Sequence, residues 1–439
     1  MEAFMKRLTD HLIVISFDCL SSLDFPAIKD MPNFKDLLVK GSHCPNVKSI
    51  YPSVTYPCHA TIVTGNFPNK HGVINNTHLQ PGSSSPDWYW HRHHVKGTTL
   101  YDEAKKAGMT TAALLWPVTA KAEIDYNMPE IFANRPWHHQ IAVSLWNGST
   151  SFQLEMNRRF GHIRNGLHQP QLDDFVLESA VETIRKKKPN LMLIHFTDLD
   201  SHRHYHGFSS EEARQALRRH DQRLGRITAA LREAGIYENS TIVALGDHSA
   251  LDESKAIKPN VLLKEEGLVS VNSQGRVTDW KVYCKSCDGS AYIYLKDPND
   301  HQSLQKAEQI LNKLQKDEKN GIERILTGKE AGERGADETC AFMIEASLGY
   351  YITEGIQGKY LDDITPEDVK TGKYTYASHG YSPEKPDYHT IFMAAGKGIK
   401  EGAVIPSMHL TDEGPTFARL LGLHLGDTDG EAVQDLFQL

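Results

Sequence analysis

The sequence lacks the features that mark membrane proteins and proteins that coat nucleic acid. Its 439 residues contain no run of about 18 apolar residues, which is what a membrane-spanning helix needs. There are 48 Lys and Arg against 56 Asp and Glu, and the net charge of −8 is spread without long runs of one sign. A mildly acidic chain of this kind is poorly suited to binding nucleic acid or anionic lipid. We therefore expect no membrane association and no nucleic-acid-binding surface.

Cysteine is scarce as well. Six cysteines are spread between Cys19 and Cys340, too widely for the disulfide framework of a small secreted protein. The first apolar stretch, residues 12–17, is shorter than the core of a signal peptide and runs straight into Asp18. We therefore expect a cytoplasmic protein with reduced thiols. Cys284 and Cys287 have the spacing of a metal or redox pair, but no second pair completes a four-thiolate site, so a structural or solvent-facing role is the simpler interpretation.

What the chain does contain is a regular alternation of apolar runs and helical patterns, which is typical of an α/β fold with a parallel sheet. We expect strands at 12–17, 111–115, 191–196, 241–245 and 390–395. We expect helices at 32–40, 100–107, 172–188 and 411–421, and a long one that opens at Ser209 with a capping box and ends near Gly235.

The stretch from 257 to 375 is less regular. It offers strands at 291–295 and 340–344 and an amphipathic helix near 303–319. We predict a catalytic core made of residues 1–256 and 376–439, with residues 257–375 inserted as a smaller lobe or cap.

Three of the predicted strands end in a carboxylate: Asp18, Asp198 and Asp247. Ligands of open α/β sheets bind outside the carboxyl ends of the strands, so these groups are expected to converge. Like charges that converge repel, and a cation is their natural neutraliser. For any single aspartate, a helix N-cap is the competing interpretation.

Histidines strengthen the case for a metal. His202 follows Asp198 by four residues, which puts both side chains on one face of a helical turn, and His248 adjoins Asp247. His379 lies in a loop rich in Gly and Pro. Two sets of three ligands with open coordination positions follow: Asp18, Asp247 and His248, and Asp198, His202 and His379. Asp200 and His204 repeat the second spacing, but we favour Asp198 and His202 because Asp198 lies nearer to the strand end.

The sequence also offers a hydroxyl group, that of Thr55, as a candidate nucleophile for such a metal site. Residues 49–65 look like a loop that feeds a helix, with Thr55 and Tyr56 near the helix N-terminus. Backbone N–H groups and the helix dipole favour a negatively charged ligand there. A metal-bound hydroxyl at this point could lose its proton and attack phosphorus. A helix N-cap is again the alternative role for Thr55.

The same segment carries a family resemblance. The run Ile50-Tyr-Pro-Ser-Val-Thr-Tyr-Pro-Cys-His-Ala-Thr-Ile-Val-Thr-Gly65, followed by Asn69-Lys-His-Gly-Val-Ile-Asn-Asn76, resembles the nucleotide pyrophosphatase/phosphodiesterase family of the alkaline phosphatase superfamily. Eight residues follow the order of that family along the chain: Asp18, Thr55, Asn76, Asp198, His202, Asp247, His248 and His379. The resemblance implies an alkaline-phosphatase-like fold, a doubly wound and mostly parallel sheet flanked by helices, with two divalent metal ions, zinc in this family.

The resemblance also implies roles for these residues. Thr55 would be the nucleophile, held by the metal that Asp18, Asp247 and His248 bind. The second metal would be bound by Asp198, His202 and His379. Asn76, with the backbone N–H of Tyr56, would contact a non-bridging phosphoryl oxygen. Tyr56 corresponds to an aromatic position that stacks a nucleobase, although packing against Pro57 is an alternative. The chain departs from the family at Ser201 and Ser249, where glycine is usual.

We therefore predict a two-metal phosphodiesterase or nucleotide pyrophosphatase that works through a covalent phosphothreonine. Its substrate would be a small phosphodiester or nucleotide. A phosphonoacetate-type phosphonate hydrolase and a phosphomonoesterase are the catalytic alternatives. A zinc-binding protein without turnover is a more distant one. The aromatic and imidazole cluster from Trp88 to His94 either walls the pocket or forms a polar surface loop, and the oligomeric state is left open.

Overall fold

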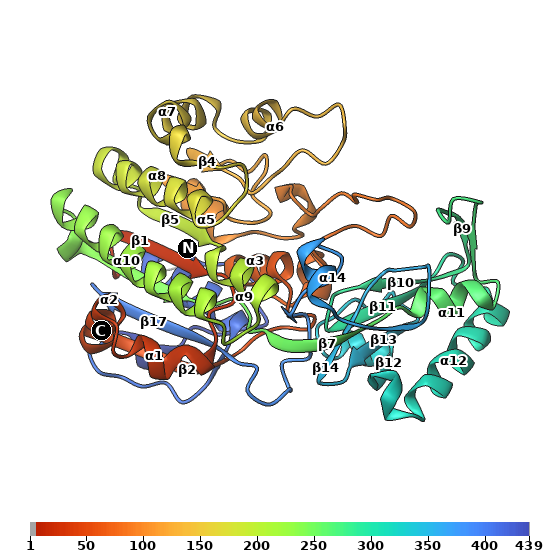
Figure 1. Ribbon diagram of the computed structural model, residues 1–439. Helices are drawn as coiled ribbons and strands as arrows, with labels where there is room; N and C mark the ends of the chain where they lie inside the picture. Colours follow the sequence, from red (N-terminus) through yellow and green to blue (C-terminus); the bar gives the residue numbers. More distant parts are fainter. Residues whose placement is uncertain (1–5, 439) are drawn as a thin grey trace.

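The main sheet of the computed structural model has eight strands (Figure 1). The structure describes residues 6–438, so the ends of the predicted core, residues 1–5 and 439, lie outside the described residues. The strands are, in spatial order, β18 (Met408–His409), β2 (Gly41–Lys48), β17 (Thr390–Gly396), β6 (Ser240–Leu245), β1 (His11–Phe17), β5 (Leu191–Phe196), β3 (Thr111–Leu114) and β4 (Tyr126–Met128). Strand β17 runs antiparallel to both of its neighbours, and the other pairs are parallel.

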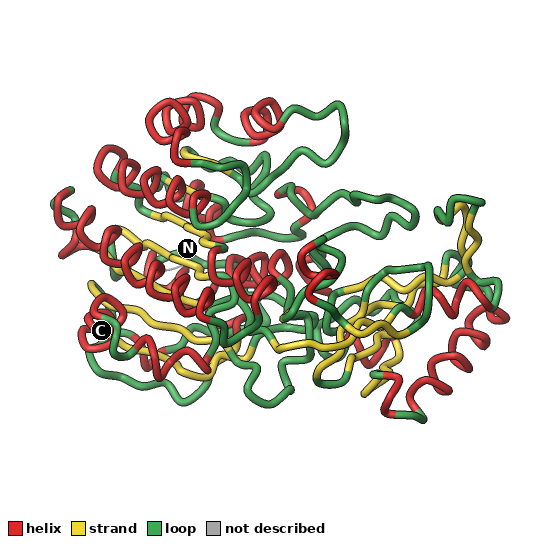
Figure 2. Tube along the Cα trace, viewed as in Figure 1, coloured by secondary structure: helices red, strands yellow, loops and turns green. Residues whose placement is uncertain are grey.

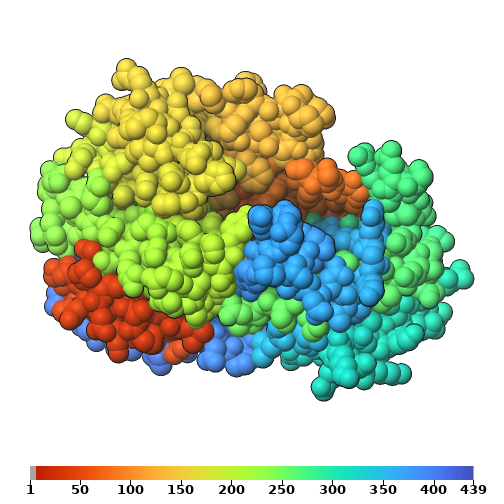
Figure 3. Space-filling view, in the orientation of Figure 1, coloured from red at the N-terminus to blue at the C-terminus, as the bar shows by residue number. Residues whose placement is uncertain are grey.

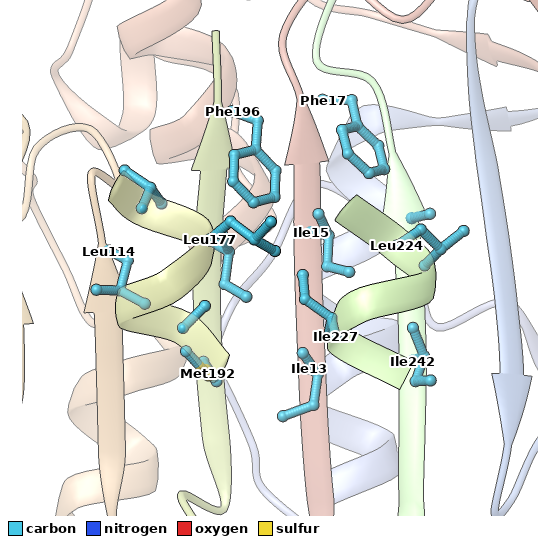
Figure 4. Close-up of a cluster of buried hydrophobic side chains, with 14 of the residues drawn as sticks. Ile13, Ile15, Phe17, Leu114, Leu177, Met192, Phe196, Leu224, Ile227 and Ile242 are labelled. Carbon is cyan, nitrogen blue, oxygen red and sulfur yellow. The ribbon is translucent and has the colours of Figure 1, made fainter. Parts of the chain in front are cut away.

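The central strands are apolar on both faces, as expected of a sheet covered on both sides. Along β1, Ile13, Ile15 and Phe17 join one hydrophobic cluster, whereas Leu12 and Val14 join another. Figure 4 shows the first cluster, in which side chains of the strands meet Leu177, Leu224 and Ile227 from the helices above them.

Helices cover both faces of the sheet (Figures 1 and 2). One face packs against α2 (Pro32–Lys40), α8 (Gln171–Lys187) and α10 (Glu211–Glu233), with α6 (Gln140–Asn147) and α7 (Thr150–Phe160) at the edge beside β4. The other face packs against α3 (Thr55–Thr64), α5 (Leu100–Lys106) and α15 (Glu413–Leu421). The short helices α1 (Phe25–Ile28) and α4 (Pro68–His71) lie in the connections. The sheet is therefore doubly wound, as predicted.

The elements from β7 (Leu251–Ile257) to β16 (Ala377–Ser378), which we call the second layer, lie beside the main sheet and have their own hydrophobic core (Figure 1). One four-stranded antiparallel sheet contains β10 (Val282–Ser286), β11 (Ser290–Leu295), β13 (Phe342–Ala346) and β12 (Ile322–Thr327). Another contains β14 (Gly349–Ile352), β7, β15 (Leu361–Asp363) and β16. The hairpin β8 (Val269–Val271) and β9 (Val277–Trp280) and the helices α11 (Pro259–Glu265), α12 (His301–Gln315), α13 (Gly328–Gly332) and α14 (Pro366–Lys370) complete it. The predicted lobe boundary at 257 falls on the last residue of β7.

Local patterns located most elements to within a few residues. The helix predicted at 303–319 is α12, and the strand predicted at 340–344 is β13, two residues further on. Helix α10 is capped by Ser210, whose side chain accepts a hydrogen bond from the N–H of Ala213, so the expectation that Ser209 opens the helix was wrong by one residue. Within residues 6–438, no helix is both long and apolar enough to cross a bilayer.

Candidate metal centre and active site

The site residues gather at one edge of the main sheet. Strands β1, β5 and β6 are parallel neighbours, so the chain leaves all three at the same edge. Asp18 follows β1 directly, and Asp247 is the second residue after β6. Strand β5 leads through Thr197 into α9 (Asp198–His206). This is the edge at which ligands of α/β sheets bind.

Asp18, Asp247 and His248 form the first group of candidate ligands. Their ligand atoms lie within 4.8 Å of one another. Asp18 Oδ1 and Asp247 Oδ2 are each 3.3 Å from His248 Nε2. The structure thus brings together all three members of the first expected set.

Two buried carboxylates this close repel each other. Burial, and then the charge of Asp247, raise the pKa of Asp18 to about 7, and burial raises the pKa of Asp247 to about 7. Asp18 Oδ1 and Asp247 Oδ2 are buried without a hydrogen-bond partner among the described residues. A cation would supply both the missing charge and the missing partner, so two carboxylates and an imidazole here fit a divalent metal.

Asp200, His204 and His379 form the second group, again with ligand atoms within 4.8 Å of one another. Asp200 Oδ2 lies 3.3 Å from His204 Nε2, and Asp200 Oδ1 lies 3.9 Å from His379 Nε2. Burial and the neighbouring His248 lower the pKa of His379 well below its usual range, which favours the neutral imidazole that binds metals. The rings of His248 and His379 stack with centroids 4.0 Å apart, so the two groups adjoin.

The structure does not bring Asp198 and His202 into this group. Asp198 is fully buried and accepts hydrogen bonds from Arg219, at 2.7 and 2.8 Å, and from Arg223, at 2.7 Å. Burial alone would raise the pKa of Asp198, but the bonds from Arg219 and His202 and the charge of Arg223 hold it well below its usual range. Its negative charge is therefore already neutralised by guanidinium groups, and the expected assignment of Asp198 and His202 as ligands is corrected to Asp200 and His204.

The correction has a simple geometric reason. Asp198 is the first residue of α9, and two further residues turn a side chain by about 200° around a helix. Asp198 consequently faces α10, whereas Asp200 faces the sheet edge. The repeated spacing at Asp200 and His204 was the signal in the sequence. Proximity to the strand end was the wrong criterion for choosing between the two.

Thr55 is the first residue of α3, and its hydroxyl points at the first group. Thr55 Oγ1 lies 3.2 Å from His248 Nε2. Val54 holds the N-cap position, and no side chain caps this helix. Thr55 therefore does not act as the helix N-cap, and its hydroxyl pairs with His248 instead.

Asn76 lies beside the same helix start. Its Oδ1 accepts a hydrogen bond of 2.8 Å from the backbone N–H of Tyr56. That N–H is therefore engaged, rather than directed at a ligand as the resemblance implied. The bond orients the Asn76 amide and leaves its Nδ2 to donate.

Tyr56 is fully buried. Its ring packs with Trp90 and Ile131, and the ring of Trp88 meets it edge-on at 5.1 Å. A base cannot stack on a ring with no exposed face, so the structure favours the packing interpretation of Tyr56 over the stacking one.

Behind the first group lies a hydrogen-bonded chain that the sequence did not reveal. His195 Nε2 is 3.1 Å from Asp18 Oδ2, and its Nδ1 is 3.0 Å from Glu130 Oε2. The other oxygen of Glu130 accepts a bond from Tyr56 Oη at 3.2 Å. Burial alone would lower the pKa of His195, but the bonds with Asp18 and Glu130 raise it well above its usual range. The available signal was a histidine inside the apolar strand β5.

A cleft of about 390 Å³ opens beside these groups. Asn76, Trp88, His204 and Ser378 are among the residues that line it. Asp288, Tyr351–Glu354 and Lys373–Thr375 form the wall contributed by the second layer. In Figure 3 the blue surface near residue 370 lies between the yellow-green surface of α9 and α10 and the green to teal surface of the second layer. Within the aromatic and imidazole cluster from Trp88 to His94, it is Trp88 that lines the cleft.

The fold and the site together define a class: a doubly wound α/β protein with adjoining groups of carboxylates and imidazoles, and a hydroxyl at a helix start, at the carboxyl edge of its sheet. A family model described as "Type I phosphodiesterase / nucleotide pyrophosphatase" matches residues 12–382. The chain belongs to this family, as the sequence resemblance implied.

Curated relatives are about a quarter identical to the chain over the residues that align with it. Human ectonucleotide pyrophosphatase/phosphodiesterase family member 1 is 24% identical over 229 residues, which cover 50% of this chain and 21% of that protein. Venom phosphodiesterase 2 of Crotalus adamanteus is 24% identical over 50% of this chain and 24% of its own length. Human family member 5 is 22% identical over 97% of this chain and 77% of its own. The chain thus spans under a quarter of the length of the first of these relatives.

Solved structures share the fold over nearly the whole chain. Murine ectonucleotide pyrophosphatase/phosphodiesterase 5, as an inactive variant in complex with AMP, superposes with a TM-score of 0.68 at 19% identity, covering 98% of this chain and 100% of that one. The human protein gives a TM-score of 0.67 with the same identity and coverage. The alkaline-phosphatase-like fold predicted from the sequence is confirmed.

Proposed function

We propose that the chain is a metal-dependent phosphoric diester hydrolase that cleaves phosphodiester or pyrophosphate bonds of small nucleotides. The observation that carries the proposal is the position of the Thr55 hydroxyl. It lies at the start of α3, 3.2 Å from His248 Nε2, and His248 belongs to one of two adjoining groups of candidate ligands. A buried hydroxyl in this position suits a nucleophile.

Two divalent ions, zinc in our proposal, would be held by the two groups. Asp18, Asp247 and His248 would hold one, and Asp200, His204 and His379 the other. Carboxylate and imidazole donors with open positions are typical of catalytic zinc. Bound there, such ions favour deprotonation of a hydroxyl and neutralise charge on the phosphoryl oxygens.

The chain's own residues then carry out a two-step displacement. Thr55 Oγ1 loses its proton to solvent and bonds to phosphorus in line, while the bond from phosphorus to the leaving oxygen breaks and its electron pair stays on that oxygen. The Nδ2 of Asn76, held in place by the N–H of Tyr56, donates to a non-bridging oxygen. Water then hydrolyses the phosphothreonine and regenerates Thr55.

The cleft supports a nucleotide as substrate. A related structure carries AMP, and the cleft here has an aromatic wall at Trp88, whose ring is partly exposed. Stacking on an aromatic ring accepts any base. We therefore assign the stacking surface to Trp88 in place of the buried Tyr56.

A rate comparison tests the proposal. Zinc-loaded protein would be assayed with the p-nitrophenyl ester of thymidine monophosphate and with p-nitrophenyl phosphate, each with a chelated control. We expect a chelator-sensitive preference for the diester of more than about tenfold, which is about 1.4 kcal/mol of transition-state discrimination.

The other outcomes separate the alternatives. A preference for the monoester would indicate a phosphomonoesterase. Activity on phosphonoacetate alone would indicate a phosphonate hydrolase. Inertness toward all three substrates with bound zinc would indicate a metal-binding protein without turnover.

A further inference from the structure

Cys19 has an unusual backbone conformation next to the candidate metal centre. It follows Asp18 directly, and its φ is 66°, a left-handed value that non-glycine residues seldom adopt. Its side chain is fully buried. Such conformations persist where the surrounding structure holds them, and they are frequent at functional sites.

The thiol lies at the junction of the two ligand groups. Cys19 Sγ, an oxygen of Asp200 and a nitrogen of His248 lie within 4.8 Å of one another. Asp200 belongs to one group and His248 to the other. Cys19 is the one cysteine that takes part in any such group within residues 6–438.

Unpartnered oxygens around the thiol point independently to a ligand. Asp18 Oδ1, on a side chain 4% exposed, lies 3.3 Å from the same His248 Nε2 and has no hydrogen-bond partner among the residues the structure describes. Asp200 Oδ1 is a second buried oxygen for which these residues supply no hydrogen-bond partner. A buried carboxylate oxygen without a donor calls for a partner, and a nearby cation would supply one.

Burial raises the pKa of the Cys19 thiol well above its usual range, and the guanidinium of Arg203 is the neighbouring group that opposes this shift most. Arg203 Nη1 lies 3.7 Å from Cys19 Sγ, and the buried guanidinium is fixed by a 2.6 Å bond to Asp24. The N–H of Cys19 donates to Asp247 Oδ1 at 3.1 Å, which ties the residue to the first group. Contacts of this kind orient ligands and tune them.

We propose that Cys19 supplies a thiolate ligand at the junction of the two groups, in addition to their carboxylates and imidazoles. The inference rests on the proposed metal centre. On binding, the S–H bond breaks, its proton passes to solvent, and the sulfur donates an electron pair to the metal, so no oxidant or reductant is needed. The carboxylates of Asp18, Asp200 and Asp247 together with this thiolate carry four negative charges, which balance two divalent cations.

A thiolate changes which metals the centre prefers. Soft sulfur donors favour zinc over magnesium, calcium and manganese, which prefer oxygen ligands. Cys19 would therefore make the centre selective for zinc.

X-ray absorption at the zinc edge tests this directly in the full-length protein. A zinc–sulfur shell falls at about 2.3 Å, whereas zinc–nitrogen and zinc–oxygen shells fall at about 2.0–2.2 Å. The wild type would be compared with Cys19→Gly, which accepts the positive φ without strain. Cys44→Ala, which alters a buried cysteine in β2, is the matched control.

We expect the sulfur shell in the wild type and in Cys44→Ala and its loss in Cys19→Gly, with the nitrogen and oxygen shells retained in all three. Bound zinc with only nitrogen and oxygen neighbours in the wild type would overturn the role of Cys19 and leave the metal centre standing. Wild-type protein that binds no zinc would overturn both. If Cys19→Gly fails to fold, Cys19→Ser in a zinc against manganese competition replaces it, and we expect its preference for zinc to fall by at least about tenfold.

Discussion

At the scale of single residues, the site depends on how one hydroxyl and one amide are held. Thr55 begins α3 without capping it, so its hydroxyl remains available beside His248. Asn76 is fixed through its oxygen, so the direction of its nitrogen is set before any ligand arrives. Preorganisation of this kind is what stabilises charge that develops in a transition state.

Replacing the Thr55 hydroxyl should abolish turnover. We expect Thr55→Ala to lower kcat by about 10³-fold or more, because the nucleophile is lost, while the metal content stays unchanged. Steady-state kinetics and elemental analysis measure the two effects. Thr64→Ala is the control, since Thr64 is a buried threonine of the same helix whose hydroxyl donates to the carbonyl of Ala60 and accepts from the N–H of Asn66. Unchanged turnover in Thr55→Ala would remove the nucleophile assignment.

The chain from Asp18 through His195 to Glu130 should tune metal binding. We expect His195→Asn to weaken zinc affinity by about 10- to 100-fold, because Asp18 loses the partner that orients it. Competition with a chromophoric chelator measures the affinity. His71→Gln is the control, since His71 is equally buried but bonds to Thr61, away from the ligands. Equal losses in both variants would mean that the effect is one of packing.

At the scale of elements, the start of α9 decides which carboxylate lies in the second group of candidate ligands. The helix begins at Asp198, and its rotation turns Asp198 toward Arg219 and Arg223 and turns Asp200 toward His379. Asp198 thereby ties α9 to α10 through Arg219 and Arg223, and Asp200 lies in the second group of candidate ligands.

Two isosteric changes should separate these roles. Asp200→Asn should lose a metal ion and activity with little loss of stability. Asp198→Asn should keep the metal but lose about 1.5–3 kcal/mol of stability, because the buried Arg223 loses one of its charged partners and keeps Asp173 and Asp174. Metal analysis and denaturant unfolding provide the measurements. Loss of metal from Asp198→Asn at unchanged stability would restore the assignment first made from the sequence.

A further test asks which of two adjacent serines, Ser209 or Ser210, caps the N-terminus of α10. Ser210→Ala should cost about 1 kcal/mol of unfolding free energy, because the N–H of Ala213 loses its acceptor. Ser209→Ala should cost almost nothing. Urea unfolding of the two variants measures the difference, and the reverse order would place the cap at Ser209.

At the scale of the whole molecule, stability should depend on pH and on metal together. Without metal, the pKa of Asp18 and of Asp247 rises from 3.8 to about 7 on folding. Between these values the folded protein binds more protons than the unfolded one, so its stability falls as the pH rises. Metal binding needs the ionised carboxylates and therefore strengthens as the pH rises.

The gain in Tm on adding zinc should consequently grow between about pH 5 and about pH 8. Thermal unfolding with zinc and with a chelator, at several pH values, measures it. Metal-free protein whose stability increases across this interval would contradict the origin that we assign to the shifts.

The extent of the inserted lobe and the cytoplasmic location expected from the sequence stay predictions.

Local patterns were enough to predict the sheet and the edge that carries the site. The apolar residues on both faces of β1, β5 and β6 require a sheet covered on both sides, and strands that run parallel must end at one edge. Asp18, Asp247 and His248 were expected at that edge for this reason, whereas His379, which follows β16, was chosen for its loop rich in Gly and Pro. Thr55 was predictable because a helix start follows its loop.

Only the tertiary structure decided the rest. Arg219 and Arg223 reach Asp198 from the next helix, so no pattern within α9 could tell that this carboxylate was already neutralised. The burial of Tyr56 likewise depends on residues far along the chain, such as Ile131. Local sequence determines where backbone elements begin and end, but the direction and charge state of a side chain depend on the neighbours that packing brings to it.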